Sequence, residues 1–283
     1  MPGTNEIRRH MAAVEQTQKI TGAMEMISSN RMRQVMGHID QNRLYFANIR
    51  RMMKELLTSP HETTHPCFLE RPRSHNTFLV ISGDKSLCGA HNANVLNYTL
   101  ARLKETPGSA LITLGHTAED FFIAHGIIPD IALLGIVHDP TLAKAREVAS
   151  ELTRLYEDEL TDDIRIIYTS FYGDSKGKPV EFRLLPIILH DYDDVSDAES
   201  LVEILYHPSP QTVLDMLVPQ YTIGLLFGVL VQAYASEHYA RMNAMHTSTK
   251  NASEMLDGLR TKHNLARQSA ITNEMSITAH PQL

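Results

Sequence analysis

The chain has 283 residues, of which 43% are hydrophobic and 21% are charged, with a formal net charge of −7 and no tryptophan. This is an ordinary globular balance, with enough residues for one large or two modest folding units. The stretch closest to a membrane span, Tyr221–Tyr234, is too short and is interrupted by Gly224 and Gly228. We therefore expect membrane association only through partners. The polar, helix-forming start carries no signal or transit pattern, which favours an intracellular protein.

Charge is distributed unevenly along the chain. Residues 1–57 carry nine Lys or Arg and five Asp or Glu, and residues 209–283 carry five of each kind. Residues 58–208 therefore carry 12 basic and 23 acidic side chains. We expect the ends and the acidic middle to face different partners, although charge differences of this size also arise by drift on solvated faces.

Residues 1–57 are expected to form one long helix. Thr4 or Asn5 can cap its start, and no proline follows until Pro60. Apolar residues recur three or four positions apart, and the polar residues Gln18 and Thr21 interrupt them. The apolar positions are Ile7, Met11, Val14, Met24, Ile27, Met32, Met36, Ile39, Phe46, Ile49, Met53 and Leu56.

Residues 58–76 are expected to form a linker, because they include three prolines and three histidines. The run 61–65 reads His-Glu-Thr-Thr-His, the pattern of helical zinc proteases. That motif needs two histidines on one face of a helix, whereas Pro60 and Pro66 bracket the run and Pro66 disfavours helical geometry at His65. We interpret it as a chance match and expect no zinc site of this kind.

Residues 77–208 are expected to form a Rossmann-like α/β domain. Short apolar segments alternate with amphipathic helical ones, which is typical of a mostly parallel sheet covered on both faces. The predicted strands are Phe78–Ser82, Ala110–Leu114, Ile131–Val137 and Ile164–Phe171, with Val180–Leu189 at the edge. The predicted helices are His91–Lys104, Thr117–Ala124 and Leu142–Glu159.

The loop after the first predicted strand is where such domains often bind nucleotides. Here it reads Gly-Asp-Lys-Ser-Leu-Cys-Gly over residues 83–89, which is neither a dinucleotide fingerprint nor a Walker loop. The fold alone does not imply a cofactor, and we expect none.

The two cysteines, Cys67 and Cys88, do not form a pattern typical of a metal site. No second cysteine pair accompanies them, and a disulfide is improbable inside a cell. We expect Cys88 to be a small buried residue. The acidic runs 157–159 and 191–194 are expected to form solvated edges, although paired carboxylates could bind a cation.

Residues 209–283 are expected to form a second long helix. Ser209 can cap it, and Pro210 suits its first position. Unbroken, it would be roughly 100 Å long at ~1.5 Å per residue, too long for a compact domain of this size. Pro219 is expected to kink or split it. From Met242 a heptad seam follows Met242, Met245, Thr249, Ala252, Leu256, Leu259, His263, Ala266, Ala270, Asn273 and Ile277.

Two long helices at opposite ends of one chain predict an antiparallel coiled coil with the α/β domain inserted between them. We expect Met242–Ile277 to pair with residues from Ile7 to about Met36. The small and polar residues of the seam are unusual for a coil selected only for stability. They indicate close approach of the helices or a second function.

Three separated stretches resemble the gamma subunit family of F-type ATP synthases. The first holds Glu6-Ile7-Arg8, Thr17–Thr21, Ala23–Met26 and Arg31–Arg33; the second holds Leu87–Gly89 with Asn92 and Asn94. The third, which is highly specific, holds Ala235–His238, Ala240–Met242, Ala244-Met245, Thr249–Ala252, Asn264, Ala266–Gln268 and Ala270–Thr272.

The resemblance implies the central rotor shaft of an ATP synthase, driven by a flow of protons or sodium ions. In that family the coil sits inside a ring of alpha and beta subunits, and its foot and globular domain join the epsilon subunit and the membrane c-ring. The resemblance further implies one copy per complex at the cytoplasmic face of a bacterial membrane, catalysis on other chains and no nucleic-acid partner.

The resemblance also implies partner-binding residues. Met24 and Arg241 match positions that meet an acidic loop of beta, with Glu237 close to Arg241. Tyr206 matches a position near the c-ring and epsilon. Positions that contact the upper loops of beta are matched by Arg267, Gln268 and Thr272. Each of these residues could instead be a helix-surface or seam residue that only packs.

Some features depart from the family pattern. Ser86 replaces a usual glycine, Pro219 lies inside the second helix, and Pro281 is expected to stop that helix early. Two other interpretations stay open: a rotor subunit of an alternative rotary ATPase, and a stand-alone nucleotide-dependent enzyme built on the middle domain. The second lacks a phosphate-binding loop and a recognisable acid–base pair.

Overall fold

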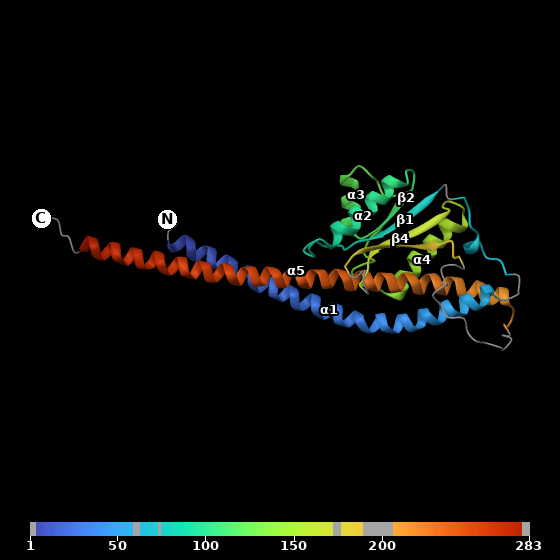
Figure 1. Ribbon diagram of the computed structural model, residues 1–283, viewed down its shortest axis with the longest axis horizontal. Coiled ribbons are helices and arrows are strands. Elements are labelled where there is room, and N and C mark those ends of the chain that lie inside the picture. The colour runs from blue at the N-terminus through green and yellow to red at the C-terminus, as the bar shows by residue number, and fades with distance from the viewer. Residues whose placement is uncertain (1–3, 59–62, 73–74, 172–176, 189–205, 279–283) are drawn as a thin grey trace. The chain divides into compact units, whose positions relative to one another are not determined.

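The computed structural model describes residues 4–58, 63–72, 75–171, 177–188 and 206–278, with side chains at 38–43, 273–274 and 276–278 left aside. Two long helices, α1 (Thr4–Thr58) and α5 (Pro210–Thr278), lie near the two ends of the chain (Figure 1). The chain divides into two compact units, which we call the coil unit (1–30 and 241–283) and the sheet unit (31–240).

In the coil unit, the first part of α1 runs antiparallel to the last part of α5. Antiparallel pairing follows from two contacts between side chains: Thr21 contacts Thr249, whereas Glu25, farther along α1, contacts His246, which comes earlier in α5. The predicted coil is confirmed. Its apolar cluster consists of Ile7, Val14, Ala252, Leu256 and Leu259, with Met11 and Ala266 against it.

The seam of α1 in this unit differs from the prediction at one position. Every seventh residue is buried, which gives Ile7, Val14, Thr21 and Ser28. Ile27, predicted to lie in the seam, is 53% exposed, whereas Ser28 is 2% exposed. Ile27 was predicted to lie in the seam because it is apolar. The seven-residue spacing of the coiled coil instead places Ser28, the next residue, in the seam.

The sheet unit is built on five strands in the order β3-β2-β1-β4-β5. Three parallel pairings join β1 (Asn76–Ile81), β2 (Ala110–Leu114), β3 (Ile131–Leu133) and β4 (Asp163–Thr169), and β5 (Pro179–Leu185) adds an antiparallel edge. The predicted α/β class is confirmed. Strand β3 ends earlier than predicted, because Gly135 takes a φ of +75°, outside strand geometry.

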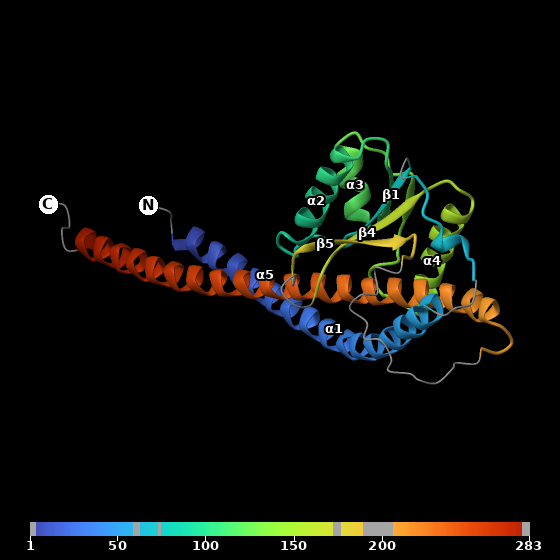
Figure 2. The same cartoon turned by 45° about the vertical axis from the view of Figure 1, so that its right-hand side comes forward.

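Helices cover both faces of this sheet (Figure 2). On one face α2 (His91–Glu105) and α3 (His116–Ala124) pack with Phe78 and Val80. On the other face α4 (Leu142–Glu157) and α5 pack with Leu79 and Ile81. Alternate residues of β1 thus enter opposite cores, which explains why a central strand reads as a continuous apolar run.

The start of α5 is capped as predicted, since the Thr212 N–H donates to Ser209 Oγ at 3.2 Å. The helix is not split at Pro219. Pro219 and Asp215 are both exposed, so the Asp215 carbonyl that loses its helical partner lies on the side of the helix where water can bind it. Leu217 and Val218 are buried beside the proline, and their packing holds the helix in place.

The apolar stretch of α5 belongs to the core. By length and composition, α5 has a window of mean hydropathy 1.6 that could cross a membrane, but 56% of that window is buried inside the protein. Tyr221 stacks on Phe46 of α1, with ring centroids 5.4 Å apart. Gly224 leaves room for the ring of Tyr45, which would lie 3.3 Å from a Cβ at this position.

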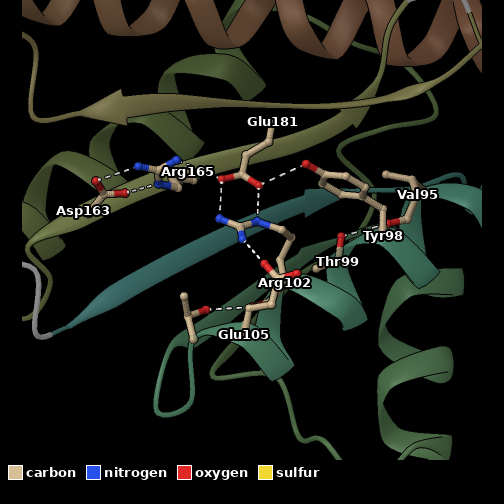
Figure 3. A network of polar contacts seen from close by, with 9 residues as sticks. Val95, Tyr98, Thr99, Arg102, Glu105, Asp163, Arg165 and Glu181 are labelled. Atoms are coloured by element: carbon tan, nitrogen blue, oxygen red, sulfur yellow. Dashed lines mark hydrogen bonds and ion pairs between the residues drawn. The ribbon is translucent and has the colours of Figure 1, made fainter.

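A network of charges ties α2 to the edge of the sheet (Figure 3). Arg102 of α2 donates to both oxygens of Glu181 on β5, at 2.7 and 3.2 Å. Arg165 of β4 donates to Glu181 at 2.9 Å and to Asp163 at 2.7 Å. Burial alone would raise the pKa of Glu181, but the hydrogen bonds and charges of the two arginines outweigh it and lower that pKa below its ordinary value of 4.5.

We predict that Glu181→Gln lowers the free energy of unfolding near neutral pH by about 1–3 kcal/mol, because it removes a buried charge on which two guanidinium groups depend. Since the folded-state pKa is lowered, the contribution of Glu181 is present above pH 4.5 and is lost as the pH falls through its lower folded-state value. Urea unfolding at a series of pH values measures both effects.

Glu105→Gln is the matched control. Its carboxylate also pairs with Arg102 but is 61% exposed, so the loss should stay below about 1 kcal/mol. Equal losses for the two variants would contradict the role given to Glu181.

Candidate partner-binding surfaces

The middle of the coil is held by polar contacts rather than by apolar ones. The hydroxyls of Thr21 and Thr249 lie 2.7 Å apart across the two helices. One turn further along, His246 Nδ1 lies 3.0 Å from Glu25 Oε1. The predicted polar seam positions therefore bind each other. The Glu25–His246 pair was missed, because neither residue is apolar and the seam was read from apolar spacing.

The outside of the coil unit carries large apolar side chains. They are between 46% and 66% exposed and come from both helices. A solvated helix face would normally be polar. Seven exposed large apolar side chains on one pair of helices are available for contact with a partner. The residues are Ile20, Met26, Ile27, Met255, Leu265, Ile271 and Met275.

The last part of α5 lies beyond the apolar cluster that joins the two helices of the coil unit. Ala266 still packs against the cluster that contains Ile7, near the start of α1, and α5 continues to Thr278 (Figure 1). Arg267, Gln268 and Thr272, predicted to bind beta, lie in this extension and are exposed. The Thr272 hydroxyl donates to the Gln268 carbonyl at 3.0 Å, whereas the side chains of Arg267 and Gln268 face solvent.

The other predicted residue pair of the coil unit is less accessible. Met24 is partly buried on α1, and Arg241 on α5 is only 7% exposed. Arg241 is thus a largely enclosed cation, which the sequence pattern did not indicate.

Glu237 lies in the sheet unit and is 6% exposed. Its carboxylate occupies the space beside Gly83, where a Cβ would lie 2.7 Å from Glu237 Cδ. Gly83 is therefore the missed companion of Glu237, and it connects α5 to the loop that follows β1. A residue with a side chain at position 83 would have to displace this carboxylate.

The loop 83–89 is closed on its own side chains. The Gly83 N–H donates to Asn92 Oδ1 at 2.9 Å, and Asn92 Nδ2 donates to the Lys85 carbonyl at 3.2 Å. The amide of Asn92 thus holds the two ends of residues 83–85 by hydrogen bonds to the backbone. Cys88 in this loop is a buried free thiol, as predicted for a small core residue, and Cys67 is also free and buried.

Tyr206 precedes α5 and packs partly against the main core of the sheet unit. Burial, assisted by the nearby carboxylate of Glu55, raises the pKa of Tyr206, so its phenol stays protonated at neutral pH. The predicted residues therefore form no single site. Met24, Arg241, Arg267, Gln268 and Thr272 belong to the coil unit, and Glu237 and Tyr206 belong to the sheet unit.

These features define a class of protein that works through contacts with other chains: a coil with exposed apolar side chains, joined to a parallel-sheet domain. The family model for ATP synthase matches residues 3–277. The ATP synthase gamma chain of Heliobacterium modesticaldum is 33% identical over 98% of this chain and 97% of its own, and that of Moorella thermoacetica is 34% identical over 97% and 96%. The chain belongs to the ATP synthase gamma chain family, and the resemblance is confirmed.

Solved structures agree on the fold. A chain from the rotor of the Euglena gracilis mitochondrial ATP synthase superposes with a TM-score of 0.65 over 95% of this chain and 98% of its own, at 16% identity. A chain from another rotational state of the same enzyme gives 0.67 over 98% and 94%, at 18% identity. The fold is thus retained where most residues have changed.

The hydroxyl pair in the seam generates a prediction. Thr21→Val should lower the free energy of unfolding by about 1 kcal/mol, because it leaves the Thr249 hydroxyl without its partner across the seam. The double variant with Thr249→Val should recover to within about 0.5 kcal/mol of the original chain or exceed it, because both partners are then apolar. Urea unfolding followed by circular dichroism completes the double-mutant cycle.

Thr247→Val serves as the control, since the Thr247 hydroxyl is exposed and bonds only within its own helix, to the Asn243 carbonyl. Additive losses in the double variant would show that the two seam hydroxyls do not stabilise each other.

Proposed function

We propose that this chain is the central-stalk gamma subunit of a proton- or sodium-translocating F-type ATP synthase. In this role it couples rotation driven by ion flow to the conformational cycle of the catalytic beta subunits. The observation that carries the proposal is the set of exposed large apolar side chains on the coil unit, together with the exposed residues Arg267–Thr272 beyond its apolar cluster, because both are accessible to a surrounding partner. Membership of the gamma chain family supports it.

The extension of α5 fits a surrounding sleeve. From Arg267 to Thr278 it is a single helix with exposed Ile271 and Met275. An isolated helix of this length is marginal in water, so its stability in the assembly depends on what encloses it. In the proposal, the ring of alpha and beta subunits encloses it, and the Arg267 guanidinium binds a carboxylate of the upper beta loops. Gln268 and Thr272 contact the same loops.

Coupling requires contacts that differ between the states of beta. A shaft that bound every beta conformation equally would shift no equilibrium. We infer that Met24 and Arg241 of the coil unit contact an acidic loop of beta, and that Glu237 of the sheet unit also binds a partner. Arg241 is only 7% exposed, so a partner can reach its guanidinium only over a small area. The strength of this contact should therefore depend on how the shaft is oriented relative to beta.

The sheet unit is proposed as the foot of the shaft. Tyr206 would lie near the c-ring and the epsilon subunit, so that the membrane is reached through partners, at its cytoplasmic face. In this organisation residues 1–57 and 209–283 form the shaft helices, 58–76 the linker and 77–208 the globular domain. We propose that the chain itself is non-catalytic and needs no cofactor.

Affinity purification of the chain from native membranes tests the function. The proposal expects alpha, beta, epsilon and c subunits in the eluate. Their absence, or specific nucleotide turnover by the purified chain alone, would overturn it and would favour an enzyme built on the sheet unit.

The contact of the α5 extension with beta is tested by Arg267→Ala combined with Gln268→Ala. Because both side chains face solvent in the free chain, the variant should keep its thermal unfolding midpoint. In the complex, loss of a charge-assisted contact of about 1.5–3 kcal/mol should lower ATP synthesis in membrane vesicles or impair assembly.

Arg154→Ala is the control, because this exposed arginine of α4 pairs only with Glu151 and Asp158 among the contacts described for it. Synthesis at the original rate by the double variant would refute the contact, as would an equal loss in the control.

A further inference from the structure

Three side chains with different ligand atoms meet on the sheet unit, beside the path from α1 to β1. A ring nitrogen of His65, the sulfur of Cys67 and a carboxylate oxygen of Glu157 all lie within 4.8 Å of one another. We call these three residues the 65–67–157 cluster. His65 and Cys67 come from the linker, and Glu157 is the last residue of α4. Sequence reasoning did not group them, because it looked for cysteine pairs and for two histidines on one helix.

The backbone holds the cluster in place. His65 has extended geometry (φ −144°, ψ 139°), as predicted for the residue before Pro66, and it caps the short 3-10 helix η1 (Pro66–Phe68). The Cys67 carbonyl accepts from the Ile187 N–H at 2.8 Å. The Tyr156 hydroxyl donates to the Leu69 carbonyl at 2.6 Å, which fixes the linker to the end of α4 next to Glu157.

A second set of bonds fixes the linker just before His65. The Thr64 N–H donates to Gln211 Oε1 at 3.0 Å, and Gln211 Nε2 donates back to the Thr64 carbonyl at 2.8 Å. The cluster is therefore assembled on backbone that two helices already hold, so that an ion would bind to side chains and would not have to order the chain.

The donor set suits a borderline-soft divalent ion. One sulfur, one imidazole nitrogen and one carboxylate oxygen are the ligand types of Zn²⁺, which binds them at about 2.0–2.3 Å. Ligand atoms on one tetrahedral ion are then about 3.5 Å apart. The atoms of the cluster need to close by about an ångström from their present upper limit, which side-chain rotation can supply.

The Cys67 sulfur is buried close to the Glu157 carboxylate, so a divalent ion bound between them would offset the repulsion between a thiolate and that carboxylate.

Binding of an ion at His65 would exchange the hydrogen bond that caps η1 for a metal bond. The Cys67 N–H donates to His65 Nδ1 at 3.1 Å, so the neutral ring carries its proton on Nε2 and its lone pair on Nδ1. An ion bound at Nδ1 takes the place of that N–H. The Cys67 S–H bond breaks as the sulfur–metal bond forms, its proton passes to solvent, and the ion loses one bound water for each ligand.

We propose that His65, Cys67 and Glu157 form a zinc site that joins the linker to the end of α4, with a water molecule as fourth ligand. Cys67 is fully buried and Glu157 is exposed, so the open position faces solvent. The ion would act as a cross-link that stabilises the junction between α1 and the sheet. This inference does not depend on the proposed function in the synthase.

Titration of the purified, metal-free full-length chain with Co²⁺, and then with Zn²⁺ as competitor, tests the site. We expect one Co²⁺ per chain with a sulfur-to-cobalt charge-transfer absorption, displaced by one equivalent of Zn²⁺. Zn²⁺ should also raise the thermal unfolding midpoint, because it binds only the folded arrangement. Glu157→Gln should weaken binding roughly 10- to 100-fold or more, since even outer-shell partners are worth that much.

Matched variants decide whether the cluster is the site. Cys67→Ser should abolish the absorption, whereas Cys88→Ser, at the other buried thiol, and Asp158→Asn, beside Glu157, should leave it unchanged. If Cys67→Ser does not fold, Glu157→Gln and His65→Gln still report on the site through Co²⁺ affinity. Absence of the absorption in the original chain would overturn the proposal, as would its loss in Cys88→Ser or its persistence at full affinity in Glu157→Gln.

Discussion

Burial of the apolar face of α5 is the interaction on which the rest of the structure depends. This helix supplies Leu214, Leu226 and Leu230 to the main core of the sheet unit, and later Leu256 and Leu259 to the coil unit. Each fully buried leucine contributes about 1.5–3 kcal/mol relative to exposure. An isolated α5 would expose all of these side chains to water. The sheet, α4 and α1 bury them, and α5 depends on that burial. Its interruption by Pro219 is tolerated because packing on both sides of the proline outweighs one lost hydrogen bond.

Spacing and composition predicted most of the fold, and local chemistry explains where they failed. The seam of α5 from Met245 to Ala266 and the Ser209 cap follow from side-chain positions alone, and so they were predictable. Ser28 was not, because a small polar residue in a seam has no apolar signal, and the length of β3 depended on a positive φ at Gly135. Contacts between residues far apart in the sequence cannot be predicted from local patterns. Glu25 with His246, Gly83 with Glu237, and the 65–67–157 cluster all join residues far apart in the sequence.

The proposed functional residues differ in how exposed their side chains are in the free chain. Arg267 and Gln268 are exposed and ready to bind, whereas Arg241 and Glu237 are largely enclosed. Sequence resemblance treats these positions alike, because it compares identities and not accessibility. The structure therefore separates two groups of proposed contact residues: solvent-facing ones near the end of α5, and largely buried ones whose side chains are already fixed by packing. Fixed side chains lose little conformational freedom on binding, which favours a rigid contact.

The exposed end of α5 links the lifetime of the chain to its assembly. Helical segments with few packed contacts open locally at little free-energy cost, and open backbone is what proteases cleave. A chain made in excess of its partners presents this end unprotected, whereas an enclosed end is stabilised by mass action in proportion to the partner concentration. The feature that suits α5 to a sleeve would then also mark unassembled copies for removal, so that the stoichiometry of the complex is kept by degradation as well as by synthesis.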